Sequence, residues 1–511
     1  MTNSLNRRDF LKLAGLTALS LSTPPFVRIL NSSKFVQGQN GKPNILIVLF
    51  DTLSAENMSI YGYARETMPN LKKWAERAIV YHNHFSGGNF TTPGTASLLT
   101  GTYSWKHRAF DYNGKVIQDF TDKSIFHAFK NYHRLAYSHN PLVNTLFNQF
   151  TLDIDDYLPM TRLMLTSDGL IQTMFKHDDD ASTVAWLRFM KKGEDGYAYS
   201  LFLSELYRRY MQNKISSYKS IFPFGPPSTK GDNYFRIEEA TQWLEENLDK
   251  LPSPFFTYFH LLPPHYPYKP PVDFLGSFKN DGMTFVDKSQ DPFTDNNSSD
   301  FLAARRFLYD EFILYVDREL SRLFDHLDSS GILDNTWVVF TSDHGEMFER
   351  GIWSHSTATL YQPVIRIPLI IFEPGRKTRL DIHDATSSTD LLPTLLQLTG
   401  QPPVDWTEGV ILPPFAPETQ KPEQSVYAVQ ARYVETNTPI NQATIMLVKG
   451  QYKLVYFFGY KELNGAELVQ LYDLKQDPNE LNDLSLTKKA TANELLAEVK
   501  SKLAEVNEPY L

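Results

Sequence analysis

The sequence predicts an α/β fold: a sandwich with a large, mostly parallel sheet, followed by a small antiparallel sheet near the C-terminus. Short apolar runs alternate with amphipathic helical segments, which is typical of a parallel sheet covered by helices. After residue 424 the pattern changes to short strands separated by Lys449-Gly450 and Asn464-Gly465, which are hairpin signals. With 511 residues, 42% of them hydrophobic, the chain can bury a core of this size.

The strands and helices of the main sheet follow from these patterns. Continuous apolar runs, typical of strands buried on both faces, occupy residues 44–50 (NILIVLF), 255–262 and 337–340. Apolar residues at helical spacing predict helices at 237–248 and 312–327. Asp51 and Asp343 lie at the ends of two of the strands. Because functional sites in such sheets lie beyond the carboxyl ends of strands, both carboxylates are candidate site residues.

We expect the chain to divide into three parts. Residues 1–40 form a signal and linker, residues 41–424 the main domain, and residues 425–511 a subdomain of short strands with a terminal helix over about 490–506. Within the main domain, residues 150–235 are helical and aromatic-rich without strand signals. They are expected to form an insertion near the mouth of the site.

The first residues carry the pattern of an export signal. Arg7 and Arg8 precede Phe-Leu-Lys and a moderately apolar run, residues 13–21, that is too short for a stable membrane-spanning helix. Paired arginines in this setting resemble a bacterial twin-arginine signal. We therefore expect export by the twin-arginine translocon to the periplasm or another extracytoplasmic space. The alternative is a chance arginine pair, and the lack of a clear cleavage site also leaves room for an uncleaved anchor.

Composition excludes several classes of function. The net charge of -9 and the isoelectric point near 5.8 argue against general nucleic-acid binding, which requires an excess of Lys and Arg. The chain has no cysteine, which excludes disulfides, thiolate metal ligands and a cysteine nucleophile.

A hydroxyl-rich segment, residues 91–101 (TTPGTASLLTG), predicts a helix with Thr92 as its N-cap and Pro93 in the first helical position. The hydroxyl of Thr91 would then face unpaired N–H groups and the positive end of the helix dipole, which favour an alkoxide and an anionic ester. Taken alone, Thr91 is more simply explained as part of the cap.

Asp51 and the pair Asp343-His344 change that balance. Two carboxylates, an imidazole and the hydroxyl of Thr91 could bind a divalent cation, and the cation would lower the pKa of the hydroxyl. Spacing alone does not establish a metal site, because an Asp-His pair at a strand end is often a loop cap.

A series of motifs resembles the sulfatase family of the alkaline phosphatase superfamily. In chain order they are residues 44–51 (NILIVLFD), 61–63 (YGY), 67–71 (TMPNL), 91–101, 264–268 (PHYPY), 341–346 (TSDHGE), 471–474 (LYDL) and 477–480 (DPNE). The resemblance runs from about residue 43 to residue 482, so it covers most of the chain. It implies an alkaline phosphatase-like α/β/α sandwich, with a catalytic domain in residues 41–424.

The resemblance also implies roles for individual residues. It places the nucleophile at Thr91, and the contacts to the ester oxygens and leaving group at His265 and His355. It implies one divalent ion (Ca²⁺, Mn²⁺ or Mg²⁺, with Zn²⁺ as an alternative) bound by Asp51, Thr91, Asp343 and His344. Asn89 and His107 flank the nucleophile segment and are weaker candidates.

Three positions depart from the family's pattern. Family sulfatases carry Cys or Ser at the position of Thr91 and convert it to formylglycine, whereas a threonine can give only a ketone. The family's Arg is replaced by Thr95, and the second Asp of its Asp-Asp pair by Thr52. Fewer ligands and one fewer cationic group favour one metal ion and a monoanionic ester. Threonine nucleophiles occur in the wider superfamily, in phosphodiesterases and phospho-group transferases.

The sequence therefore predicts a metal-dependent ester hydrolase or transferase that acts through Thr91 on a small-molecule, lipid or glycan ester, with a phosphodiester favoured. One alternative is a sulfuric ester hydrolase that works without formylglycine. Another is a catalytically inactive binding protein with the same fold, which Thr52 and Thr95 favour. The retained Asp51, Asp343 and His344 argue against inactivity.

Overall fold

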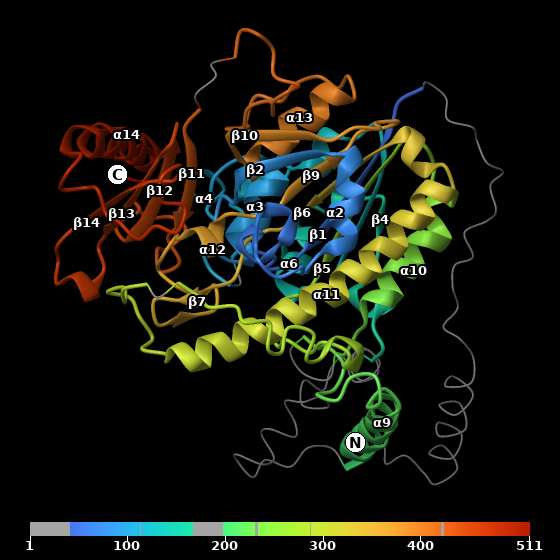
Figure 1. Ribbon diagram of the computed structural model, residues 1–511. Helices are drawn as coiled ribbons and strands as arrows, with labels where there is room; N and C mark the ends of the chain where they lie inside the picture. The colour runs from blue at the N-terminus through green and yellow to red at the C-terminus, as the bar shows by residue number, and fades with distance from the viewer. Residues whose placement is uncertain (1–40, 113, 167–197, 230–232, 287, 421–423) are drawn as a thin grey trace, which may run out of the picture. The chain divides into compact units, whose positions relative to one another are not determined.

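The buried runs of the sequence form strands of one eight-stranded sheet in the computed structural model (Figure 1). The strand order is β10-β2-β9-β6-β1-β5-β3-β4, and every neighbouring pair is parallel except those of β9. The strands are β1 (Asn44–Phe50), β2 (Ile79–Phe85), β3 (His133–Ser138), β4 (Asp156–Tyr157), β5 (Phe255–Leu261), β6 (Thr336–Thr341), β9 (Leu369–Phe372) and β10 (Leu380–Ser387).

The structure describes residues 41–112, 114–166, 198–229, 233–286, 288–420 and 424–511. The predicted signal in residues 1–40 and a large part of the predicted insertion lie outside these residues. Residues 41–511 form one compact unit.

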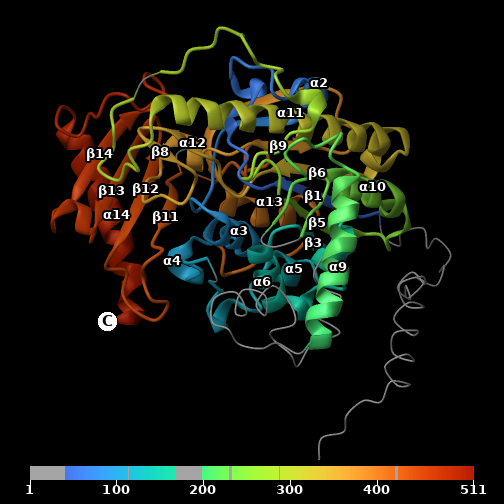
Figure 2. The same cartoon turned by 90° about the horizontal axis from the view of Figure 1, so that it is seen from below.

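Helices cover both faces of the large sheet, as Figure 2 shows from below. One face packs against α2 (Pro69–Trp74), α10 (Ile237–Asn247) and α11 (Ser299–Ser329). The other packs against α3 (Thr91–Thr100), α5 (Ile125–Ala128), α6 (Pro141–Gln149) and α13 (Leu391–Leu398). Alternate residues of β1 enter the two cores, Leu46 and Val48 on one side and Ile45 and Ile47 on the other. Burying each such side chain stabilises the fold by about 1.5–3 kcal/mol.

The predicted small sheet is also present. Its strands are β11 (Val426–Gln430), β12 (Ala443–Lys449), β13 (Tyr452–Phe458) and β14 (Leu468–Asp473), all antiparallel and followed by α14 (Lys489–Asn507). One face of this sheet packs against α14. The opposite face packs against the segment that carries α12 (Gln362–Ile365), β7 (Phe348–Glu349) and β8 (Ile352–Trp353). The fold class predicted from the sequence is therefore confirmed.

Two local expectations differ from the structure. Residues 150–235 were expected to lack strands, but β4 adds a two-residue strand to the edge of the large sheet beside β3. A strand this short leaves no periodic signal in the sequence. The described part of the segment is otherwise mainly helical, with α9 (Ala198–Ser216) as its longest helix.

Among the described residues, no helix has both the length and the apolar character needed to cross a membrane.

Candidate active site

The ends of three adjacent strands place the acidic residues of the site. β1 lies between β5 and β6, and Leu49 is level with both His260 in β5 and Thr341 in β6. Asp51 follows β1, and Asp343 follows β6. Parallel strands end at the same edge of a sheet, so the side chains of Asp51, His260 and Asp343 converge there. All three are buried.

Helix α3 presents Thr91 to this edge. The helix begins at Thr91 with Phe90 as the N-cap residue, so the prediction of Thr92 as N-cap and Pro93 as the first helical residue was wrong. The first turn lies against the backbone of the Asp343 loop: a Cβ atom on Gly94 would come within 2.3 Å of the Asp343 carbonyl oxygen. Only glycine permits this approach, which brings Thr91 close to the carboxylates of Asp51 and Asp343.

Four polar atoms converge around the ring of His344. Its Nε2 lies 3.4 Å from Thr91 Oγ1 and 3.5 Å from both Asp51 Oδ1 and Asp343 Oδ2. Its Nδ1 donates to the Gly345 carbonyl at 2.9 Å, which leaves the lone pair of a neutral ring on Nε2. Burial and the nearby His355 lower the pKa of His344 well below its usual value, so the ring is neutral.

Asp51 is held by one of its two oxygens. Oδ2 accepts a hydrogen bond from Asn140 Nδ2 at 2.6 Å and lies 3.1 Å from His260 Nε2, whereas the buried Oδ1 has no hydrogen-bond partner among the described residues. Burial by itself raises the pKa of Asp51. The hydrogen bond with His260, and then the electrostatic attraction of His265 and His260, outweigh burial, so the net pKa lies below the usual value and the carboxylate is ionised.

Asp343 is the less acidic partner. Burial, and then the charge of Asp51, raise its pKa well above the usual value, because two carboxylates this close cannot both ionise without positive charge between them. The ligand atoms of Asp51, His260 and Asp343 all lie within 4.8 Å of one another. A free carboxylate oxygen, a second carboxylate and imidazole nitrogens are a suitable donor set for a divalent cation. These residues fit a divalent cation, although the group contains His260, which the sequence analysis did not propose as a ligand, beside the predicted Asp51 and Asp343.

His265 and His355 lie together at the edge of this cluster. The ring centroids of the two histidines are 5.1 Å apart, and that of His355 is 4.4 Å from that of His344. The Nδ1 atom of His355 lies 3.1 Å from Glu346 Oε1, and Tyr268 donates to the other oxygen of Glu346 at 2.9 Å. The structure therefore gathers all six predicted site residues, and Glu346 fixes the orientation of His355.

The two weaker candidates have supporting positions. The side-chain amide of Asn89 donates to the carbonyls of His355 and Thr357, at 3.2 and 2.7 Å, and so fastens the His355 segment. His107 uses both ring nitrogens inside the fold, with Ser97 Oγ at 3.1 Å and the Ala109 N–H at 3.1 Å. Burial lowers the pKa of His107 to about 3, so it is a neutral core residue.

Thr52 and Thr95, which depart from the family's pattern, both contact the carboxylate of Asp343. The backbone N–H of Thr52 donates to Asp343 Oδ1 at 3.3 Å, while its hydroxyl donates to the Asp51 carbonyl. Thr52 adopts a φ of 60°, which costs a β-branched residue about 1–3 kcal/mol. The hydroxyl of Thr95 reaches Asp343 Oδ2 at 3.5 Å. Neither threonine supplies the charge of the residue that the family has at its position, which is Asp for Thr52 and Arg for Thr95.

Sequence reasoning missed three residues of the site, His260, Asn140 and Glu346. His260 is a polar residue inside the buried run of β5, and a fully buried histidine requires a partner; that was the available signal. Asn140 follows β3 and caps α6 through its bond to the Leu142 N–H, so its sequence pattern indicates only a helix start. Glu346 is the last residue of the motif at residues 341–346, but the motif alone did not indicate that it contacts His355.

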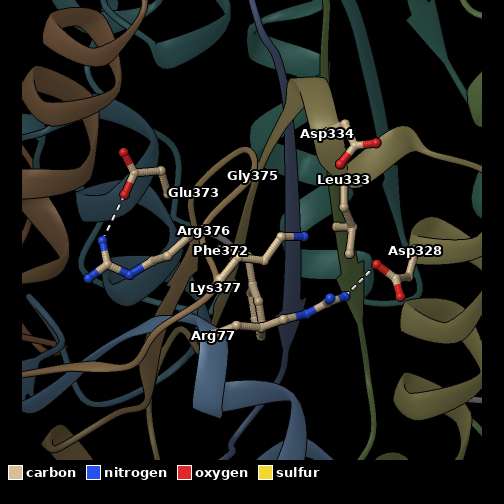
Figure 3. A pocket seen from close by; sticks show the side chains of 9 residues that line it. All are labelled: Arg77, Asp328, Leu333, Asp334, Phe372, Glu373, Gly375, Arg376 and Lys377. Carbon is tan, nitrogen blue, oxygen red and sulfur yellow. Dashed lines mark hydrogen bonds and ion pairs between the residues drawn. The ribbon is translucent and has the colours of Figure 1, made fainter.

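A pocket elsewhere carries no comparable chemistry. It is lined by residues near the beginning of β6 and the end of β9 (Figure 3). Arg77 pairs with Asp328 at 2.5 Å and Arg376 with Glu373 at 2.8 Å. It lies at the amino end of β6, whereas Asp343 lies beyond the carboxyl end of that strand.

Comparison with known proteins shows the family of the chain. Residues 43–155 and 172–401 match the sequence profile of the family described as Sulfatase. The chain belongs to the sulfatase family. Residues 351–509 of this sulfatase-family protein also match the profile described as N-sulphoglucosamine sulphohydrolase, C-terminal. The membership confirms the predicted family, and the protein is a sulfatase-type hydrolase of ester bonds.

Individual relatives span nearly the whole sulfatase-family chain. Choline-sulfatase of Rhizobium meliloti is 25% identical over 473 residues, which cover 87% of this chain and 83% of the relative. Arylsulfatase K of Homo sapiens is 25% identical over 469 residues, with coverage of 87% and 79%. The structure of the phosphonate monoester hydrolase of Agrobacterium radiobacter superposes with a TM-score of 0.65 at 20% identity and covers 92% of this chain and 96% of its own. At this identity the superposition supports the fold alone.

Proposed function

We propose that this protein hydrolyses a monoanionic ester, with a phosphodiester favoured, through a covalent intermediate on Thr91. The observation that carries the proposal is the position of the Thr91 hydroxyl. It lies at the start of a buried helix, 3.4 Å from the unprotonated nitrogen of His344 and 3.3 Å from Asn140 Nδ2. A hydroxyl beside the groups that would hold the cation, within reach of a hydrogen-bond donor and at the positive end of α3, is suited to act as a nucleophile in its alkoxide form.

The chemistry of the residues follows from these contacts. A divalent cation held by Asp51, Asp343 and His344 would supply positive charge that favours the Thr91 alkoxide and the anionic ester. Thr91 gives up its hydroxyl proton to solvent, and its Oγ1 attacks the phosphorus or sulfur atom. The bond to the leaving oxygen breaks, and this oxygen takes up a proton from solvent and departs as the alcohol. His265 and His355 hold the non-bridging and leaving oxygens. Water, or an acceptor alcohol in a transferase, then displaces Thr91 and restores its hydroxyl.

The charges near the nucleophile support a monoanionic reacting group. Thr95 and Thr52 supply neither the cation nor the additional carboxylate of the family's pattern, and Thr95 instead contacts Asp343. A site with one less positive side chain stabilises a single negative charge better than a double one. The same argument admits a sulfuric ester, and the named activities of choline-sulfatase and Arylsulfatase K favour that second candidate.

The substrate is a small-molecule or glycan ester under either candidate. A panel of aryl phosphodiester, phosphomonoester, phosphonate and sulfate substrates, assayed with Ca²⁺, Mn²⁺, Mg²⁺ and Zn²⁺, ranks the two candidates. Faster turnover of the phosphodiester supports the favoured reaction. Faster turnover of the sulfate ester favours the alternative, and no turnover of any ester by metal-loaded protein favours the inactive binding protein.

Substitution of Thr91 tests the nucleophile. Thr91→Ala should lower kcat by at least a few thousandfold, because a covalent route loses its first step. The variant should fold normally, since the hydrogen-bond contacts of the Thr91 hydroxyl in the described structure are with His344 and Asn140 and not with the backbone of α3. Thr91→Ser should keep measurable activity. With a slow substrate, intact mass should show an adduct on the peptide that contains Thr91, and an adduct on another residue would refute the assignment.

Export by the twin-arginine translocon to the periplasm or another extracytoplasmic space is part of the proposal, and it rests on Arg7 and Arg8 with the apolar run that follows them. Replacing both residues by Lys should retain the protein in the cytoplasm. Cell fractionation measures this, and export of the variant would contradict the signal.

A further inference from the structure

Three aromatic side chains surround an arginine beside the catalytic histidines. Arg305 lies in α11, and its guanidinium carbon is 5.1 Å from the ring centroids of Phe301 and Trp353 and 5.7 Å from that of Tyr266. The rings of Tyr266 and Trp353 meet edge to face at 5.1 Å, and those of Phe301 and Trp353 at 5.7 Å. Contacts of this kind orient a guanidinium group and leave its N–H donors available.

The aromatic cluster is continuous with the active site. Tyr266 directly follows His265, and Trp353 precedes His355 by two residues. The indole N–H of Trp353 lies 3.3 Å from the hydroxyl of Tyr268, which is the residue that donates to Glu346. Tyr266 is 41% exposed, which is unusual for a large aromatic side chain beside a buried site. The cluster therefore adjoins the reacting centre on the side of His265 and His355 and is partly open to solvent at Tyr266.

Arg305 is cationic and lacks an acidic partner. It makes no ion pair or hydrogen bond with any other residue that the structure describes. Arg318, on the same helix, is the contrasting case. It also lies over aromatic rings, at 4.8 and 5.4 Å, but it pairs with Glu319 at 2.9 Å. Because the chain has a net charge of -9, an arginine without a carboxylate partner beside the site is suited to an anion that arrives with the substrate.

We propose that Arg305, with Tyr266 and Trp353, forms a subsite for a second anionic group on a ring-bearing substrate. The aromatic side chains contact the ring, and the guanidinium of Arg305 binds the carboxylate, sulfate or phosphate that the ring carries. The inference rests on the proposed function, since it assigns the remaining part of the same substrate. It favours acidic sugars or acidic aryl esters and disfavours esters with a cationic organic group, because the unpaired guanidinium repels a second cation.

The test measures binding without turnover. Benzenesulfonate and para-sulfobenzoate are stable sulfonates that share one ring and one reacting-group analogue, and only the second carries an additional carboxylate. Their Kd values are measured by calorimetry with Mn²⁺ present, in the wild-type protein, in Arg305→Gln and in the control Arg318→Gln. We expect the wild-type protein to prefer para-sulfobenzoate about tenfold, the effect of a charged hydrogen bond. Arg305→Gln should abolish the preference and Arg318→Gln should retain it.

The outcomes separate this inference from the proposed function. Equal affinity for the two compounds, a preference that survives in Arg305→Gln, or no binding of either compound would overturn the subsite. Tyr266→Ala supplies a second measurement. It should raise the Kd of both compounds to a similar degree, because both carry the ring that Tyr266 contacts. Turnover by Thr91→Ala would refute the nucleophile and leave the binding result intact.

Discussion

Replacing Glu346 by Gln tests how firmly His355 must be held for turnover. Glu346 is fully buried, and its two carboxylate oxygens contact His355 Nδ1 at 3.1 Å and the Tyr268 hydroxyl at 2.9 Å. Gln has nearly the same shape, and its amide can accept from His355 and donate to the hydroxyl oxygen of Tyr268. The substitution therefore removes the charge and keeps the packing.

The expected loss follows from the kind of hydrogen bond removed. A hydrogen bond to a charged group contributes about 1.5–3 kcal/mol and a neutral one about 0.5–1.5 kcal/mol, so Glu346→Gln weakens the hold on His355 by roughly 1 kcal/mol or slightly more. If His355 holds an oxygen in the transition state, kcat should fall about tenfold while KM changes little. Glu346→Ala would also leave two buried groups without partners and is a poorer test.

A double-mutant cycle shows whether the effect passes through His355. In a His355→Gln background, Glu346→Gln should cause less than about a twofold further loss, because the two residues act as one unit. Glu349→Gln is the matched control, since this carboxylate lies three residues away and pairs with Lys288 instead. Wild-type turnover in Glu346→Gln, or losses that multiply in the double variant, would refute the positioning role.

Three further predictions concern stability and metal binding. Lys453→Met should lower the free energy of unfolding by about 3–5 kcal/mol in urea titrations, because Glu480 stays buried without its cation; Lys453→Met/Glu480→Gln should recover part of the loss. Burial raises the pKa of Asp390 from 3.8 to about 7, so its stabilising contribution is complete below pH 3.8 and is lost as pH rises through 7. The free energy of unfolding of the wild-type protein, measured relative to that of Asp390→Asn, should fall by up to about 4 kcal/mol between pH 4 and 8. A difference between the two proteins that does not change with pH would contradict this. Chelation should remove about one divalent ion per chain and lower Tm, and Asp343→Asn should bind none; unchanged metal content in that variant would place the ion elsewhere.

The sheet was predictable where burial alone determines the strand. The run of residues 44–50 is apolar at nearly every position because β1 packs helices on both faces, and its predicted bounds match the structure. β4 was not predictable, because two residues become a strand only through pairing with β3. The start of α3 was displaced by two residues, since a Thr-Thr-Pro sequence offers more than one capping arrangement and tertiary contact of Gly94 with Asp343 selects one of them.

The site was predictable where residues follow strand ends and motifs. Asp51 and Asp343 were found because strand ends meet at one edge of a parallel sheet, and Thr91 because its motif resembles the nucleophile segment of the sulfatase family. His260 and Asn140 were missed for opposite reasons. His260 lies within an apolar run that suggests only core, and Asn140 has a local role as a helix cap that conceals its bond to Asp51. Side chains that orient a ligand are defined by contacts across the fold, which spacing along the chain does not encode.

The charges of the site connect the proposed reaction with the proposed subsite. Asp51 and Asp343 together would balance one divalent cation, and no arginine stands at position 95 to neutralise a second charge on the reacting group. A dianionic reacting group would therefore meet two carboxylates with little compensation. A second negative charge is better placed at a distance, where Arg305 lies among aromatic rings without a carboxylate partner in the described chain. We infer that selectivity divides between these two places. The nucleophile region accepts one charge, and the second is recognised on the organic part, so moving the carboxylate of an aryl ester away from the ring should remove the preference without changing the chemistry at Thr91.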